Sequence, residues 1–103
     1  MIRIRCSVAA AALLAAAPAL QAQDNTLLAR SLAATCANCH GTGGQARGDM
    51  KPLAGRSAEK ILAAIADFRS GAQPATVMHQ ISKGYTDEQL RLVAGWFAAQ
   101  KAK

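Results

Sequence analysis

One short segment, Cys36-Ala37-Asn38-Cys39-His40, brings two thiols and an imidazole within five residues. The cysteines are three positions apart, so on a helical turn both thiols face the same way. This C-x-x-C-H spacing is typical of covalent c-type haem attachment, in which each thiol adds to one haem vinyl group and the histidine binds the iron. The motif predicts Cys36 and Cys39 as the thioether residues and His40 as the proximal iron ligand.

Two other uses of these cysteines, and one other function of an attached haem, have to be weighed. A thioredoxin-like redox dithiol has a βαβ pattern around it, and the sequence shows none. A zinc knuckle needs a second pair of ligands, and His79 is the only further histidine. A haem enzyme with an open sixth position, such as a peroxidase, is disfavoured because no histidine or arginine cluster accompanies the motif. These alternatives remain beside haem attachment, which the motif favours.

The second axial iron ligand has three candidates. Met50 lies ten residues past His40, too near to reach the opposite haem face. Met78 lies 38 residues past it, in an irregular segment that can arch over that face. A thioether ligand raises the reduction potential relative to a second histidine. We predict Met78 as the distal ligand and His79 as a surface histidine that points away.

The first 22 residues resemble an export signal rather than a structural segment. Arg3 and Arg5 precede an unbroken apolar run at 7–17, which Pro18 ends and small residues follow. The run is shorter than the roughly 20 apolar residues of a membrane-spanning helix. We therefore expect a secretory signal peptide at 1–22, cleaved after Ala19 or Ala22, and a periplasmic domain at 23–103 without a membrane span. Cys6 belongs to the discarded segment.

Composition indicates that the remaining chain needs a cofactor to build a core. Residues 23–103 contain only 14 Leu, Ile, Val and Phe side chains, although alanine is abundant. So small a domain with so few large apolar side chains usually depends on a staple, metal or cofactor. Removing Arg3 and Arg5 with residues 1–22 lowers the net charge from +6 to +4. The remaining basic residues are scattered singly and aromatic residues are few, which excludes nucleic acid as a partner.

The elements that must position the motif are helical. Leucines one turn apart predict a helix over 24–35 that begins at Asp24 or Asn25. Glycines make 41–55 a loop. Apolar periodicity predicts further helices over 57–70 and from Thr86 or Asp87 to about 100, with an irregular stretch containing a short helical piece at 72–84. No alternating strand pattern occurs. The fold class is all-α, with three or four short helices.

Several segments together carry a family resemblance. The sequence C-A-N-C-H-G-T-G-G, then L-A-G at 53–55 and D-F-R-S-G at 67–71, resembles class I monohaem cytochromes c of the c4 and c553 type. The stretch P-A-T-V-M-H-Q-I-S-K-G-Y-T-D-E at 74–88 resembles the cytochrome subunit of flavocytochrome c sulfide dehydrogenase. The resemblance covers 24–100 and implies a small class I cytochrome c fold around one covalently bound haem. It also implies thioethers at Cys36 and Cys39, with His40 and Met78 as iron ligands.

The resemblance does not decide which backbone carbonyl accepts a hydrogen bond from His40. In the family, the carbonyl of a proline after the loop methionine often accepts a hydrogen bond from the proximal histidine. Here that proline stands one place later, in Met50-Lys51-Pro52. Either the Lys51 or the Pro52 carbonyl could therefore orient His40.

The function that these observations imply is electron transfer. The resemblance points to the electron-accepting subunit of sulfide dehydrogenase, which is not an enzyme on its own. A flavoprotein subunit would oxidise sulfide, and this chain would pass electrons to a soluble cytochrome or an oxidase. The alternative is a free c553-type carrier that serves a terminal oxidase.

Overall fold

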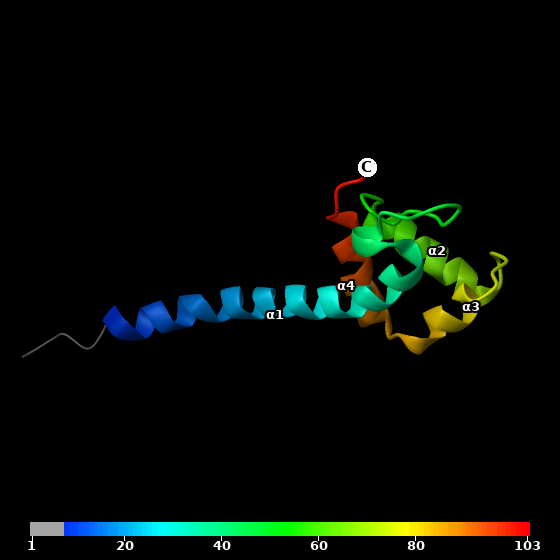
Figure 1. The fold of residues 1–103 in the computed structure, drawn as a ribbon. Coiled ribbons are helices and arrows are strands. Elements are labelled where there is room, and N and C mark those ends of the chain that lie inside the picture. Colours follow the sequence, from blue (N-terminus) through cyan, green and yellow to red (C-terminus); the bar gives the residue numbers. More distant parts are fainter. Residues whose placement is uncertain (1–7) are drawn as a thin grey trace, which may run out of the picture.

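The computed structural model describes residues 8–103, and the regular secondary structure of this part of the chain is all helical (Figure 1). The all-α prediction is confirmed, and the described residues form no strand. The helical elements, in chain order, are α1 (Val8–His40), the 3₁₀ turn η1 (Thr42–Gly44), α2 (Ala58–Ser70), α3 (Met78–Ile81), the 3₁₀ turn η2 (Ser82–Gly84) and α4 (Asp87–Ala98).

Helix α1 is much longer than the helix predicted over 24–35. Asp24 and Asn25 lie inside it, so the predicted cap there is wrong. Alanine and leucine favour helix throughout the preceding segment, and Pro18 removes only one hydrogen-bond donor. Figure 1 shows the first part of α1 projecting from the packed helices, and all side chains from Ala19 to Leu28 are exposed. The start of the predicted signal peptide, with Arg3, Arg5 and Cys6, lies outside the described residues.

No helix in the described range 8–103 is long and apolar enough to cross a membrane.

The predicted boundaries of α2 and α4 are confirmed by their caps. The Ser57 hydroxyl accepts a hydrogen bond from the Lys60 amide at 3.3 Å, and Gly71 ends α2 in the left-handed conformation at φ 83°. Thr86 begins α4 in a reciprocal capping box with Gln89. Each cap places its helix independently of distant contacts.

The core lies where α4 crosses α1 and α2. Phe97 of α4 is only 1% exposed, and Trp96 packs half-buried against the same cluster. Ala33 of α1 and Ala94 of α4 are small enough to let these two helices approach closely. The buried cluster consists of Ala33, Ile61, Val93, Ala94 and Phe97. It is small for a domain of this length, as the composition predicts.

The glycine-rich loop at 41–55 is tied to the C-terminal end of α4. The Gly55 amide donates to the Phe97 carbonyl at 3.0 Å, and the Gln45 side chain donates to the Lys101 carbonyl. The Gly44 carbonyl accepts two amides, from Leu53 at 2.9 Å and Ala54 at 3.1 Å. The loop that follows the motif is thereby closed on itself and anchored to the core.

Replacing Gly44 with alanine is expected to destabilise the protein strongly. Gly44 has φ +75°, and an added Cβ would lie 2.7 Å from the Ala54 amide nitrogen and 2.8 Å from a Phe97 ring carbon. The left-handed backbone and the overlap together should lower the free energy of unfolding by about 3 kcal/mol or more. Gly48 is the matched control, since it has φ +60° and open space around it. Thermal unfolding should show a much smaller loss for Gly48→Ala; equal losses would contradict the packing argument.

Candidate functional site

The last turn of α1 presents the two predicted thioether residues. Cys36 is half-buried and packs against the core cluster, whereas Cys39 is exposed, and both thiols are free. The helix ends directly after His40, where the Gly41 amide donates to the Ala37 carbonyl at 2.9 Å and Gly41 turns the backbone away at φ +85°. The thiols and the imidazole are thus presented together from the end of one rigid helix.

Burial raises the pKa of the Cys36 thiol, and a backbone hydrogen bond offsets this only in part. At neutral pH the side chain is therefore held as the protonated thiol. Redox-active C-x-x-C motifs instead depend on a cysteine with a lowered pKa. The environment of Cys36 thus disfavours the dithiol oxidoreductase alternative.

His40 is oriented by a single hydrogen bond. Its Nδ1 lies 2.7 Å from the Lys51 carbonyl oxygen. Because a carbonyl can only accept, Nδ1 carries the proton and donates it. In the neutral imidazole, this tautomer leaves the lone pair of Nε2 available, which is the form that binds iron. Of the two carbonyls that the sequence left open, the structure selects Lys51 over Pro52.

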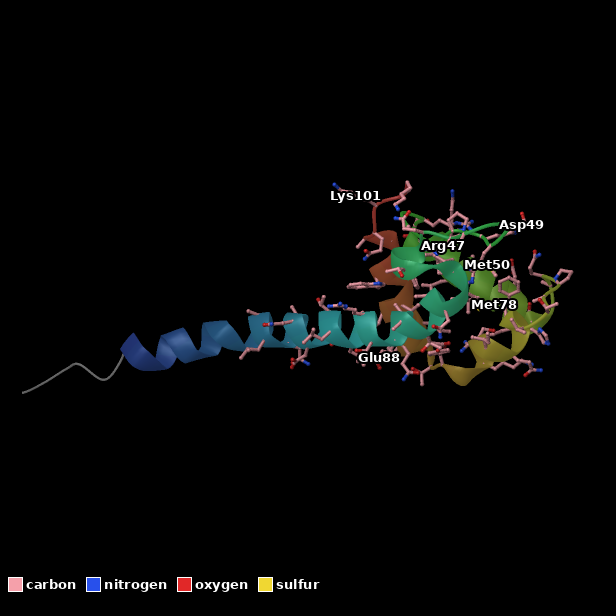
Figure 2. All side chains as sticks on the ribbon, in the orientation of Figure 1. Arg47, Asp49, Met50, Met78, Glu88 and Lys101 are labelled. Carbon is pink, nitrogen blue, oxygen red and sulfur yellow. The ribbon has the colours of Figure 1, made fainter. Side chains whose placement is uncertain are left out.

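Met78 is the first residue of α3, which packs against α2, and it is half-buried. Figure 2 shows Met50 and Met78 at the end of the molecule away from the projecting part of α1. Met50 is exposed in the loop. His79 is half-buried rather than a surface residue, and its Nδ1 is buried without a hydrogen-bond partner. The predicted surface position of His79 is therefore wrong for this part of its ring.

Exposed apolar side chains in the loop after the motif and on either side of Met78 are of the kind that a large apolar group would cover. Met50 is 42% exposed, Val77 52% and Ile81 40%. Such side chains gain about 25 cal/mol for each Å² that a bound group removes from water. Two free thiols, an imidazole and a methionine thioether also make up a donor set that suits a c-type haem.

Other candidate sites are weaker. Within residues 8–103, no group of three or more His, Cys, Asp or Glu side chains is arranged to hold a metal ion. A groove of about 510 Å³ between α2 and α4 contains none of the predicted haem residues. It is lined by Leu62, Ile65, Ala66, Arg69, Ser70, Asp87, Leu90 and Arg91.

Sequence reasoning assigned no role to Arg69. The guanidinium is part-buried and binds the backbone carbonyls of Ser82 and Tyr85 and the carboxylate of Asp87. Only the segment D-F-R-S-G drew attention to this position, and then solely as a resemblance.

Comparison with known proteins identifies the family. The chain is 32% identical over 71 residues to cytochrome c-554(548) of Halomonas halodenitrificans, and the match covers 65% of this chain and 86% of that protein. The chain belongs to the cytochrome c family. Its helical architecture is that of a small class I cytochrome c.

Two further relatives support this placement. The cytochrome is 41% identical over 66 residues to the cytochrome subunit of sulfide dehydrogenase of Chlorobaculum tepidum, across 64% of this chain and 60% of that protein. It is 34% identical over 64 residues to cytochrome c-552 of Acidithiobacillus ferridurans, across 62% of this chain. The cytochrome thus spans less than two thirds of these two relatives, and only 28% of the second. No family model matches the chain.

Proposed function

We propose that this cytochrome carries one covalently bound haem c and transfers single electrons in the periplasm. Cys36 and Cys39 form the thioethers, His40 is the proximal iron ligand and Met78 the distal one. The observation that carries the proposal is the hydrogen bond from His40 Nδ1 to the Lys51 carbonyl at 2.7 Å. It presents Nε2 in the ligand form directly after the two thiols.

The chain's own residues would set the behaviour of the bound haem, which supplies a one-electron couple at its iron. The hydrogen bond to the Lys51 carbonyl fixes the ring of His40 and makes Nε2 a more basic ligand for the iron. A methionine thioether bound to the iron would favour the ferrous state and so a higher potential.

We further propose export with a cleaved signal peptide at 1–22 and a haem domain at 23–103. The apolar run of the N-terminal segment supports this division, as does the exposure of every side chain from Ala19 to Leu28. None of those side chains is needed for the packed helices. Export in unfolded form also agrees with attachment of haem before folding is complete.

Within electron transfer, we propose the cytochrome subunit of a sulfide dehydrogenase. The support is the relative from Chlorobaculum tepidum that bears this name and is 41% identical over the matched region. A flavoprotein partner would oxidise sulfide and reduce this cytochrome, which would pass electrons to a soluble cytochrome or an oxidase. The cytochrome alone would have no sulfide-oxidising activity.

The distribution of charge fits an acidic partner. The loop at 45–56 and the C-terminal tail are joined by backbone and side-chain hydrogen bonds, and both carry exposed basic side chains. Their one acidic residue is Asp49, so this region holds the entire net charge of +4 of residues 23–103. Figure 2 shows Arg47, Asp49 and Lys101 along the upper side of the packed helices. The basic residues are Arg47, Lys51, Arg56, Lys101 and Lys103.

The deciding experiment is purification of the untagged protein from the native periplasm at low and at high salt. The proposal expects a flavin absorbance to travel with the haem at low salt and less of it at high salt, because exposed charge pairs are screened. Recombining the two subunits should give sulfide-dependent haem reduction. Efficient sulfide oxidation by the isolated cytochrome would contradict the proposed division of labour.

The second candidate is a free c553-type carrier to a terminal oxidase. The observation that favours it is the match to cytochrome c-554(548), of which this cytochrome covers 86%. If no flavoprotein accompanies the haem and an oxidase accepts its electrons directly, this function replaces the subunit role.

A further inference from the structure

Arg69 lies in the last turn of α2, and each of its three guanidinium nitrogens makes a hydrogen bond to residues 82–87. Its Nε donates to the Ser82 carbonyl at 2.9 Å, one terminal nitrogen donates to the Tyr85 carbonyl, and the other lies 2.8 Å from a carboxylate oxygen of Asp87. The Arg69 side chain is 29% exposed and Asp87 75%. The two carbonyl contacts are part-buried, whereas the ion pair is at the surface.

The carbonyls that Arg69 binds lie where the helical hydrogen-bond pattern is interrupted. Ser82 begins η2 and is only 1% exposed, and Tyr85 is in extended conformation between η2 and α4. A buried carbonyl without a partner costs free energy, and a planar guanidinium can satisfy two in fixed geometry. Arg69 therefore determines how this junction sits on α2.

This contact attaches residues 78–85, which we call the methionine segment, to the rest of the fold. In the described part of the chain, the hydrogen bonds that join residues 78–85 to any residue outside 77–85 all come from Arg69. The other hydrogen bonds of this segment, such as the Gln80 and Ile81 amides to the Val77 carbonyl, are local. Apart from packing, nothing else fixes α3 in place.

We propose that Arg69 is a positioning residue for the distal ligand, which holds the segment containing Met78 closed against the haem. The proposal rests on the proposed function, in which Met78 binds the iron. The hydrogen bonds of the Arg69 side chain go to Ser82, Tyr85 and Asp87 and not to Met78. It acts through the backbone of 82–85, and the ion pair with Asp87 is an accessory contact.

The test is the rate at which cyanide binds the ferric cytochrome, because cyanide can enter only when Met78 leaves the iron. Arg69→Gln removes the two carbonyl contacts and should speed cyanide binding about 10-fold or more, since hydrogen bonds from charged donors are among the stronger ones. Arg69→Lys keeps the charge without the planar fork and is the variant more certain to fold. Its cyanide-binding rate should lie between the rates of the parent protein and of Arg69→Gln. Asp87→Asn should change the rate by less than about 2-fold, because exposed ion pairs contribute little.

Val93→Ala is the matched control for general destabilisation. Val93 is 3% exposed in the core cluster and lies outside residues 78–85. It should lower the unfolding temperature, yet leave the cyanide rate within about 2-fold of the parent, because ligand release needs only local opening. The far-red thioether-to-ferric-iron band should persist in every variant.

The outcomes separate this proposal from the one it rests on. If the parent protein lacks the far-red band, the Met78 assignment fails, and the role of Arg69 fails with it. If the band is present but both Arg69 variants bind cyanide at the parent rate, the positioning role alone is wrong. The same holds if Val93→Ala accelerates binding as much as Arg69→Gln does.

Discussion

Replacing both Cys36 and Cys39 with alanine is expected to leave no folded cytochrome. The described core cluster has five residues, two of them alanines, and several large apolar side chains, such as Met50, Val77 and Ile81, are exposed. A covalently bound haem would supply the missing apolar volume, and a group that binds only the folded state stabilises it. The yield of soluble protein should fall by about an order of magnitude or more, judged by haem absorbance and by far-ultraviolet circular dichroism.

Cys6→Ala is the matched control for loss of a thiol. Cys6 lies in the predicted signal peptide, and its replacement should leave haem content and yield unchanged. Each single variant, Cys36→Ala or Cys39→Ala, should retain at most one thioether and lose most of the product. A folded, helical double variant without haem would show that the chain builds its own core and would contradict the account.

Met78→Ala is expected to open the sixth coordination position. The far-red thioether band should disappear, and carbon monoxide and cyanide should bind the iron readily. The potential should fall by on the order of 0.1 V or more, well inside the roughly 0.8 V range that axial ligands span. Visible spectroscopy and a redox titration measure both effects.

Two neighbouring variants test the choice of ligand. Met50→Ala should leave the far-red band intact, because Met50 is 42% exposed in the loop that follows the motif. His79→Ala should also leave it intact. If the His79 variant changes the iron spectrum in the way that loss of bis-imidazole ligation would, the assignment of Met78 is wrong.

Local signals explain most of the agreement between sequence and structure. Ser57, Gly71 and Thr86 mark helix ends because caps act within one turn, and the structure bears out all three. The predicted start of the first helix is wrong because the helix does not begin at the expected cap. Nothing local to Asp24 stops an alanine-rich helix from running through it.

The parts that could not be predicted depend on contacts between distant residues. The choice of Lys51 over Pro52 depends on how the loop folds back over His40. The role of Arg69 depends on α2 lying beside the junction of η2 and α4, 13 to 18 residues further along the chain. Residue type alone marks Arg69 as a surface charge, since the carbonyls that it binds leave no trace in the sequence.

The most direct test of the central claim is the intact mass of the exported protein after denaturation and acid–acetone extraction. A cytochrome attached through Cys36 and Cys39 should keep its haem, with a mass equal to residues 23–103 or 20–103 plus one haem. A polypeptide that loses its haem on extraction, or that carries none, would contradict the account.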